Sequence, residues 1–589
     1  MDEKLPPKLE STSSASSPAG TVTSPEERDL SPGEGQNGGS RGPPAEILLP
    51  ISRLLPLSIA LCLGLFLSFV DSSIVSTALV SIGTDFNTLS NINWIALAYT
   101  LCDLGCAVLF TSLSDVFGRR NAYIVAFILF FSASIGCGFA RSIYQLIALR
   151  SIQGIGGSGL YSLAMVMFPE IFPRSMRKWI GAVAGGVVGT SGILGPILGG
   201  VITRFASWKW IFWINAPIGV ISITMFLLAW PNSDQMKHAE RKPLRQLDVV
   251  GSFLLIAASI MVVFAFQESG THPKFWGTAL FVAPLVAGVS CWLVLIGWEV
   301  FIGVFMQESV SPLFPMSLLK RRIYVAGAIT AVITGFPYYV VIYIVPLHLQ
   351  IVNGKSPLIA GLGLLPLLVS TATGSMLGGA VSSKKDLSFY TLTVGSCLMT
   401  LGTGLLSTVW SDPSIDPKLY GFEVFVGLGF GLSVSTSTIL AGIQCEIKDH
   451  ATAQGIVAQA RVLGGSFGIA ASTAILGVIE GRELLGNLSP TQLASLDLSS
   501  LSMTQVDAVR EAYAHAFNHT MRVATILSGI SIVFTLLSYQ RNPPTRAERI
   551  QQQVAVETAR QMAKRSGPPG ASRTLSEPQI SANSSEVPT

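Results

Sequence analysis

Four ionisable side chains stand inside long apolar stretches of the sequence: Asp71, Asp103, Arg150 and Arg461. A charge within an apolar helix is costly, and such a residue is a candidate for binding a proton, an ion or a substrate. Asp71 and Arg150 fall at similar depth in their stretches, so both can face one cavity. A carboxylate beside a guanidinium is stabilised in its ionised form, and losing that contact favours protonation. The pattern predicts a proton-coupling pair, with a fixed structural ion pair as the alternative; for Asp103 and Arg461 the two roles stay equally open.

A short polar loop follows the second apolar stretch and reads Leu113-Ser-Asp-Val-Phe-Gly-Arg-Arg120. Gly118 permits a tight turn, and Asp115 can pair with Arg119 or Arg120, or lie at a helix N-terminus. Such a loop can hold two halves of a protein in one state. A simple cationic anchor at a membrane surface is the alternative.

Glycines recur at helical spacing in the fifth stretch, where Gly195-Pro196 is followed by Gly199-Gly200. Residues four apart share one face of a helix, and small residues let a second helix approach closely. Pro196 removes a backbone hydrogen bond and favours a bend. The pattern predicts a close-packed interface that seals the protein while its halves move, with static packing as the alternative.

A second glycine run, Gly154 to Gly159, matches GxGxxG but lies within an apolar stretch rather than between a strand and a soluble helix. It therefore indicates helix packing and not a nucleotide site. The sequence also contains no Walker A pattern, so we expect no direct use of ATP, and we expect no cofactor. Glu511, His515 and His519 share a helical face, but no further ligand is near them, so we predict no metal site.

The elements that position these residues are long apolar runs. Only 12% of the 589 residues are charged, whereas a soluble protein has about 25%. This composition excludes a soluble enzyme, a coiled coil, a disordered chain and a nucleic-acid binder. Fourteen runs have about the 20 apolar residues that a membrane-spanning helix needs, so the predicted fold is all-α and polytopic. The runs lie near 55–80, 92–112, 121–139, 143–168, 178–203, 210–230, 249–267, 278–300, 322–348, 357–382, 389–409, 419–442, 454–480 and 520–539.

The remaining segments set boundaries and orientation. Residues 1–50 and 541–589 are rich in polar residues, Pro and Ser, and we expect disordered tails. Most Lys and Arg of the connecting loops fall on one side if the N-terminus is cytoplasmic, which places both termini in the cytoplasm. The charged connection 231–248 then lies inside and 481–519 is the long outer loop. It holds two sequons for glycosylation, at Asn518 and Asn487.

These motifs resemble those of the major facilitator superfamily, in particular its fourteen-span drug:proton antiporters. The 113–120 loop is similar to the superfamily's signature loop, although Thr111 replaces its first Gly. Arg150, Gln153 and Gly154 resemble the proton-coupling motif of span 4, and the 195–200 segment resembles the antiporter motif of span 5. Asp71 belongs to a segment similar to the span-1 motif, Trp208 to Gly219 are similar to the span-6 entry, and Leu247-Asp248 is also familiar from this group. The resemblance covers about residues 55–540.

The resemblance implies two six-helix bundles, at 51–230 and 321–540, separated by an inner loop, two inserted helices and a linker at 231–320. It also implies a proton-driven efflux pump for amphipathic drugs, toxins or secondary metabolites, similar to fungal pumps, located in the cell membrane or alternatively the vacuolar membrane. We expect a small-molecule substrate, a lipid bilayer around the protein, no nucleic acid, no enzymatic activity and no obligate protein partner. The cavity wall is expected to be aromatic and to include Trp94, Tyr99, Phe336, Tyr338 and Tyr339. An importer of a siderophore-like chelate or an amino acid, and a non-transporting membrane receptor or sensor, are the alternatives.

Overall fold

The computed structural model describes most of the apolar body of the chain. The described residues are 50–86, 88, 91–173, 180–230, 248–272, 275–306, 310, 312–381, 387–409, 414–445, 450–484 and 502–541, with parts of 548–562. The predicted tails lie largely outside these residues, as do the 231–247 connection and Asn487. Every regular element in the described part is an α-helix, which agrees with the predicted fold class.

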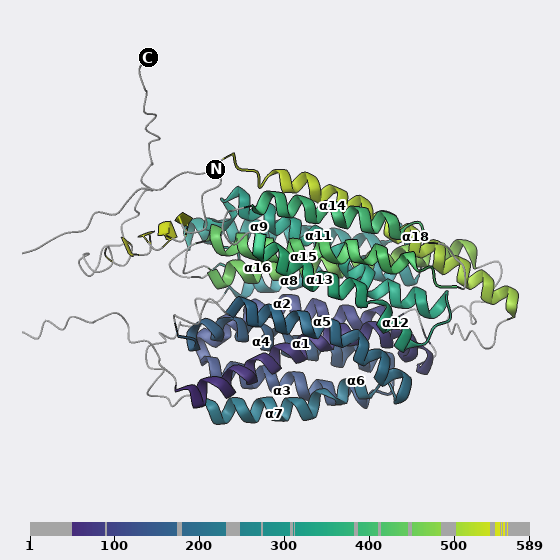
Figure 1. Cartoon of the computed structure of the whole chain (residues 1–589), viewed down its shortest axis with the longest axis horizontal. Helices are drawn as coiled ribbons and strands as arrows, with labels where there is room; N and C mark the ends of the chain where they lie inside the picture. Colours follow the sequence, from purple (N-terminus) through teal and green to yellow (C-terminus); the bar gives the residue numbers. More distant parts are fainter. Residues whose placement is uncertain are drawn as a thin grey trace, which may run out of the picture. The chain divides into compact units, whose positions relative to one another are not determined.

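The helices of the first half of the chain pack mainly on one another (Figure 1). α1 packs on α5 and α7, and α4 packs on both α2 and α3. These helices are α1 (Ile51–Asp85), α2 (Asn93–Phe117), α3 (Arg119–Gly138), α4 (Ile143–Ile171), α5 (Ile180–Phe205), α6 (Trp210–Trp213) and α7 (Asn215–Ala229).

The helices of the second half form a similar group in which α15 packs on α13 and α14, and α11 packs on α16 and α18. They are α11 (Arg322–Ile351), α12 (Pro357–Gly363), α13 (Leu365–Val381), α14 (Ser388–Leu406), α15 (Lys418–Gln444), α16 (His450–Glu483) and α18 (Met503–Leu536). α11 stays one helix although it contains Pro337 and Pro346. The first seventeen residues of α18 fall in the segment predicted as an outer loop, so that segment is partly helical.

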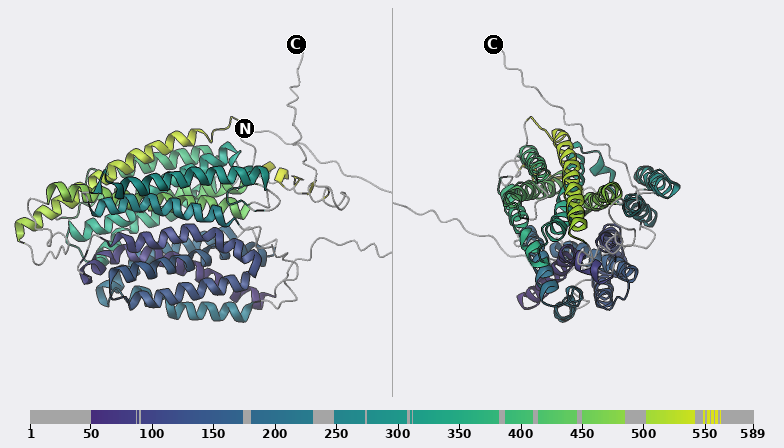
Figure 2. Two further views of the ribbon diagram at one scale, coloured as in Figure 1. Left: turned by 180° about the vertical axis from the view of Figure 1, so that it is seen from behind. Right: turned by 90° about the vertical axis from the view of Figure 1, so that its right-hand side faces the viewer.

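Two helices lie between the halves in the sequence, α8 (Val249–Thr271) and α9 (Ala279–Phe305), followed by the short α10 (Met316–Leu319). α8 packs on α2 of the first half and on α16 of the second. α9 packs mainly on α8, and the two form a teal pair at the side of the bundle in Figure 2. α9 exposes many large apolar side chains, as expected of a helix that faces lipid.

All fourteen predicted runs are helical, but the count of fourteen spans is not confirmed. Twelve segments of the described residues are long and apolar enough to cross a membrane, and a bent α2 would make thirteen. α4 falls short by composition, because Arg150, its glutamines and its glycines lower its apolar character. The same residues are the ones that carry the candidate chemistry.

Glycines of α4 bring its backbone against two neighbouring helices. A Cβ atom at Gly154 would overlap the Tyr99 backbone of α2, and one at Gly156 would overlap the backbone of Phe130 in α3. The GxGxxG run therefore packs helices, as the sequence predicted. This close packing holds Arg150, one turn earlier on α4, against α2.

Candidate functional site

The centre of the first half contains a buried ion pair between α1 and α4. Arg150 donates from Nη1 to Asp71 Oδ2, and both side chains are fully buried. The structure thus brings together the two residues that the sequence placed at similar depth. A buried pair of this kind needs further hydrogen bonds, because desolvation of both charges is costly.

Two amide side chains provide those hydrogen bonds. Asp71 Oδ1 accepts from Gln153 Nε2 at 2.8 Å and from Asn215 Nδ2 at 2.9 Å. Gln153 also accepts from Arg150 Nη1 at 2.9 Å through its Oε1 atom. Gln153 lies three residues after Arg150 on α4, so helical geometry places both on the face toward α1. Asp71 thus accepts hydrogen bonds from three side-chain donors on its two oxygens.

A hydroxyl group orients both amides. Ser134 Oγ on α3 accepts from Gln153 Nε2 at 3.1 Å and from Asn215 Nδ2 at 3.0 Å, and donates to the Phe212 carbonyl at 2.9 Å. The network thus joins α1, α3, α4 and the α6–α7 junction. The sequence reasoning gave no role to Asn215 or Ser134. The available signal for Asn215 was a polar amide within the apolar run 210–230, two residues before Pro217.

Asn215 lies where a single residue, Ile214, separates two helical segments of the predicted span 6. α6 ends at Trp213 and α7 begins at Asn215. Pro217 lies in the first turn of α7, where its missing N–H is tolerated. Asn215, which is 1% exposed, is the first residue of α7 and faces α1 and α3, where it donates to Asp71 and Ser134.

The rest of the Arg150 guanidinium faces α2. Its Nε donates to the Ile95 carbonyl at 3.1 Å, and its Cζ lies 4.3 Å from the centroid of the Tyr99 ring. Tyr99 in turn donates to the Ser68 carbonyl at 3.0 Å. Tyr99 is therefore part of the ion-pair surroundings rather than only a cavity wall. Arg150 Nη2 is buried and has no hydrogen-bond partner, so the guanidinium can accommodate one further acceptor.

The 195–200 segment of α5 packs against α1 just beyond Asp71. A Cβ atom at Gly195 would overlap Ser73, and one at Gly199 would overlap the Ile74 carbonyl and the Thr77 hydroxyl. Thr77 Oγ1 donates to the Pro196 carbonyl at 3.3 Å. Gly195 and Gly199 therefore share one helix face, and that face contacts α1 within two turns of the ion pair.

The other side of the same segment contacts the second half of the chain. A Cβ atom at Gly200 would overlap the backbone of Pro357 and Leu358 in α12, and one at Gly361 would overlap the Pro196 carbonyl. This part of α5 is thus enclosed between α1 and α12. Substitution by any larger side chain requires backbone movement at the contact between the halves.

Further hydrogen bonds join the halves near the same end of the molecule. Tyr343 on α11 donates to the Ser72 carbonyl at 2.9 Å, and Gln350 Nε2 donates to the Thr77 carbonyl at 3.3 Å. Asn93 at the start of α2 donates to Thr473 on α16 at 2.6 Å. On α1, the acceptors Ser72 and Thr77 lie between Asp71 and the end of the helix at Asp85. We predict this end of α1 to be the outer one.

The 113–120 loop forms a charged cluster at the opposite end of α2. Gly118 joins α2 to α3 with a φ of 91°, the left-handed region that favours glycine. Arg119 pairs with Asp115, and its Nη2 lies 3.1 Å from Glu170 Oε1 at the end of α4. Arg120 is exposed. The loop therefore joins α2, α3 and α4; its action as a latch between the halves stays a prediction.

Asp103 and Arg461 lie on helices of different halves and are only partly buried. Arg461 donates from Nη2 to Ser437 Oγ at 3.2 Å. Asp103 and Arg461 both interact electrostatically with Tyr161 of α4 and Tyr339 of α11. The two charged residues therefore border the same aromatic region. Neither forms an ion pair with a described residue, in contrast to Asp71 and Arg150. Tyr338 of this region stacks on Phe430, with ring centroids 3.6 Å apart.

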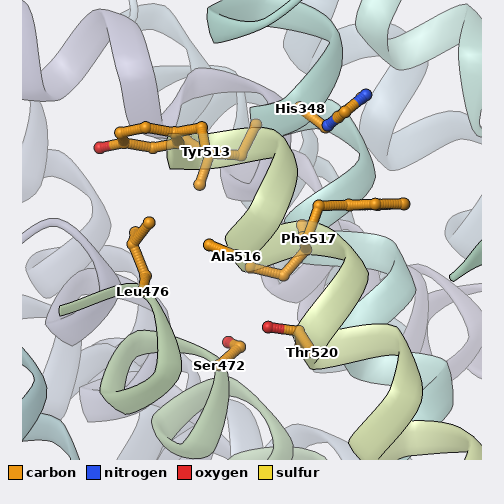
Figure 3. A pocket seen from close by; sticks show the side chains of 9 residues that line it. His348, Ser472, Leu476, Tyr513, Ala516, Phe517 and Thr520 are labelled. Carbon is orange, nitrogen blue, oxygen red and sulfur yellow. The ribbon is translucent and has the colours of Figure 1, made fainter. Parts of the chain in front are cut away.

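A small pocket lies elsewhere, between α11, α16 and α18 (Figure 3). It is lined mostly by apolar side chains, with Ser472 and Thr520 facing one another across its floor and His348 at one edge. None of the predicted site residues lines it. We therefore place the candidate site at the Asp71 network and not at this pocket.

The remaining predicted residues of the described part lie in the first half of α18. Asn518 is part of the helix, and its Oδ1 atom is buried without a hydrogen-bond partner. His515 contacts Glu483 at 3.1 Å instead of joining Glu511 and His519 in a cluster. No group of three or more candidate metal ligands occurs among the described residues.

Comparisons with known proteins give one consistent result. The sequence profile of the Major Facilitator Superfamily matches residues 61–469. The MFS-type transporter FPY5 of Fusarium mangiferae is 34% identical over 516 residues, covering 84% of this chain and 86% of that protein. The efflux pump aflT of Aspergillus parasiticus is 28% identical over 496 residues and covers 82% of this chain and 94% of its own length. The efflux pump roqT of Penicillium rubens is 26% identical over 525 residues, with 87% and 95% coverage.

Among solved structures, a bacterial homologue of the human lysosomal transporter Spinster matches with a TM-score of 0.57. That structure is 17% identical and covers 82% of this chain and 97% of its own. At this identity the likeness shows the fold alone.

Proposed function

Because the chain belongs to the Major Facilitator Superfamily of membrane transporters, we propose that it is a proton-driven exporter of amphipathic small molecules that works by alternating access. The observation that supports proton coupling best is the buried Asp71–Arg150 pair with its three hydrogen-bond donors. A carboxylate set so deeply can exchange a proton only if its donors move away. The names of the similar efflux pumps motivate the direction of transport and the substrate class.

In this proposal the proton and the substrate use the same movement. In the conformation described, Asp71 is hydrogen-bonded to Arg150 and Gln153 of α4 and to Asn215 of α7. When the halves rock and α1 shifts, Arg150 and the amides separate from Asp71, and the carboxylate binds a proton from the outer side. Return of α1 restores the donors, which displaces the proton toward the cytoplasm and resets the cycle.

The 195–200 segment of α5 is the proposed seal. It presses on α1 two to six residues after Asp71 and on α12 of the other half, beside the hydrogen bonds of Tyr343 and Gln350. A contact without side chains can close tightly and reopen with little rearrangement. This location supports a seal that acts on the proton site directly, because any shift of α1 against α5 also moves Asp71.

The proposed substrate region is the aromatic area between the halves. Tyr161, Tyr338 and Tyr339 border it, with Asp103 on α2 and Arg461 on α16 as its only charged candidates among the described residues discussed above. Aromatic walls with few fixed polar groups bind flat apolar compounds with loose selectivity. The arrangement fits export of varied compounds better than import of one highly charged solute.

We further propose fourteen spans with both termini in the cytoplasm and the 113–120 loop on the cytoplasmic side. The helical runs, including α2 and α4, each have the length to cross the hydrocarbon core. The Lys and Arg distribution of the loops supports the orientation. The two domains are then the bundles at 51–230 and 321–540, with α8 and α9 inserted between them.

The direct test is transport by the purified full chain in liposomes. We expect accumulation of a fluorescent amphipathic dye to follow an imposed pH gradient and to collapse with a protonophore, without any nucleotide. Transport that requires ATP, or that persists without a proton gradient, would overturn the proposal. A protein that binds the dye without moving it would favour the receptor alternative.

A further inference from the structure

A pair of buried acidic side chains lies where α8 begins, far along the sequence from Asp71. Asp248 caps α8: its Oδ1 accepts from the Gly251 N–H at 2.8 Å and also from Trp298 Nε1 at 2.8 Å. The side chain is 5% exposed. Its other oxygen, Oδ2, is buried and has no hydrogen-bond partner. Asp248 belongs to the Leu247-Asp248 motif, to which the export mechanism assigns no role.

Glu299, next to Trp298 on α9, completes the pair. It is 2% exposed, and its Oε2 accepts from the Phe314 N–H at 3.2 Å in the segment that leads to α10. Its carboxyl group interacts electrostatically with the Asp248 carboxyl, which accepts from Trp298, the residue before Glu299. Its Oε1, like Asp248 Oδ2, is buried without a hydrogen-bond partner among the described residues. Each of the two neighbouring carboxyl groups therefore keeps one unsatisfied acceptor oxygen.

Among the described residues, no base neutralises the pair. Asp248 and Glu299 form no ion pair with a described residue, and the groups that face them from α8, α9 and the 312–315 segment are the Trp298 indole and backbone N–H groups. Lys320 and Arg321, which follow α10, are exposed. Two carboxylates in contact away from water cannot both be ionised, because their repulsion is only weakly screened there. A single proton between the two free oxygens removes the repulsion and satisfies both acceptors.

We propose that Asp248 and Glu299 form a second proton-binding site, in which one proton is shared between Glu299 Oε1 and Asp248 Oδ2. This site goes beyond the proposed export function, since it lies outside both six-helix bundles and apart from the Asp71 network. The proton joins the start of α8 to α9 and, through Phe314, to the segment entering the second half. α8 packs on helices of both halves, so loss of the proton loosens a connection that spans them. The predicted topology places the site at the cytoplasmic end, where it would respond to cytoplasmic pH.

The test uses Glu299→Gln in the purified full chain in lipid nanodiscs. The Gln side chain keeps an oxygen for the Phe314 N–H and offers an N–H to Asp248 Oδ2, so it imitates the shared proton permanently. Asp248→Asn is the reciprocal variant, with its Nδ2 donating to Glu299. Glu268→Gln is the matched control, because Glu268 lies at the far end of α8 beside His272. Infrared spectroscopy follows the carbonyl band of protonated carboxylic acids as the pH is raised.

We expect the wild type and Glu268→Gln to show a protonated-carboxyl band that disappears at alkaline pH, with release of about one proton per chain that Glu299→Gln does not release. A site that binds its proton more tightly when folded stabilises the fold below its titration and loses that contribution as the pH rises. The wild type should therefore lose thermal stability relative to Glu299→Gln at alkaline pH. If Glu299→Gln keeps the band and the proton release of the wild type, or if the wild type shows neither, the proposal is wrong. Neither result depends on export, so the outcome is independent of the function proposed above.

Discussion

The buried charges of the first half and of the second half differ in their partners. In the first half, Asp71 and Arg150 neutralise one another, and Gln153 and Asn215 complete the hydrogen bonds of the carboxylate. In the second half, Glu423 on α15 is fully buried, and neither of its carboxyl oxygens has a hydrogen-bond partner among the described residues. Arg461 donates to the Ser437 hydroxyl and pairs with no described carboxylate.

This difference separates two tasks. A fully paired network has a strong preference for one arrangement, so it suits a site whose proton affinity must change sharply when the arrangement breaks. An unpaired, partly exposed charge beside aromatic side chains is available to a ligand instead. We infer that the first half carries proton coupling and that the second half contributes more to substrate binding.

The largest effect should come from breaking the paired network. We expect Arg150→Ala to reduce export to background, because Asp71 loses the cation that controls its protonation. Arg150→Lys should rescue export only in part, since an ammonium lacks the planar geometry of the guanidinium. Dye efflux from cells with equal surface expression of each variant measures the effect.

The matched change in the second half is Arg461→Gln, which should alter the choice of substrate while leaving proton coupling intact. Anionic and cationic dyes with the same ring system, such as fluorescein and rhodamine 123, would show the shift. Equal loss of export in Arg150→Ala and Arg461→Gln for both dyes would remove the proposed distinction between the halves. Normal efflux by correctly localised Arg150→Ala would contradict the coupling role itself.

A large side chain at the α1–α5 contact should be almost as damaging. We expect Gly195→Leu to fold and bind dye but to leak protons or remain in one orientation, because Leu cannot fit against Ser73 and Ile74. Proton flux into liposomes without substrate measures the leak. Gly189→Leu is a control on the same helix, since a Cβ atom there meets nothing within 4 Å. A Gly195→Leu protein that is merely less stable, with tight exchange in the folded fraction, would leave only a packing role.

Loss of the Asn215 side-chain amide should have an intermediate effect on export. Asn215→Ala removes one donor from Asp71 and one from Ser134, which should cost about 1–3 kcal/mol of stability. Export should fall less than in Arg150→Ala, because Arg150 and Gln153 still hold the carboxylate. Thermal unfolding in detergent and the pH dependence of efflux together check this. If only stability changes and the pH profile stays that of the wild type, Asn215 has no part in coupling.

The smallest effect is expected at the surface loop. Arg119→Ala breaks contacts with Asp115 and Glu170, while Arg120→Ala removes an exposed charge. Partly exposed ion pairs contribute about 1 kcal/mol or less, so neither variant should unfold the protein. We expect slower exchange only for Arg119→Ala, measured as the efflux rate at saturating dye. Equal rates for the two variants would argue against a latch.

Much of the fold followed from the sequence because the apolar runs must be helices in lipid. The continuity of α11 could not be read from the sequence, because Pro337 and Pro346 lie inside it; the structure shows one helix that packs on α16 and α18. The span count depends on α4, whose polar residues serve the site rather than the bilayer. The helix within the predicted outer loop had a weaker sequence signal, because the amphipathic start of α18 contains His and Glu residues and lacks an apolar run.

Site residues could be predicted where their residue type is rare inside apolar runs, and could not be predicted where that type is common there. Asp71 and Arg150 stood out because charges inside apolar runs are few. Ser134 did not stand out, because Ser and Thr occur throughout the helices and most of their hydroxyls donate to a carbonyl of the same helix. The contact of α5 with α12 also had no sequence signal, because it joins residues more than 150 positions apart. Pairings of this kind arise only from how the helices pack.

We infer above all that the Asp71–Arg150 network couples proton entry to export. Proton influx and dye efflux can be recorded at the same time with purified protein in liposomes, for the wild type and for Asp71→Asn. We expect the wild type to exchange protons for dye, and Asp71→Asn to lose proton-driven export while still exchanging dye for dye across the membrane. Proton-driven accumulation by Asp71→Asn at the wild-type rate would contradict it.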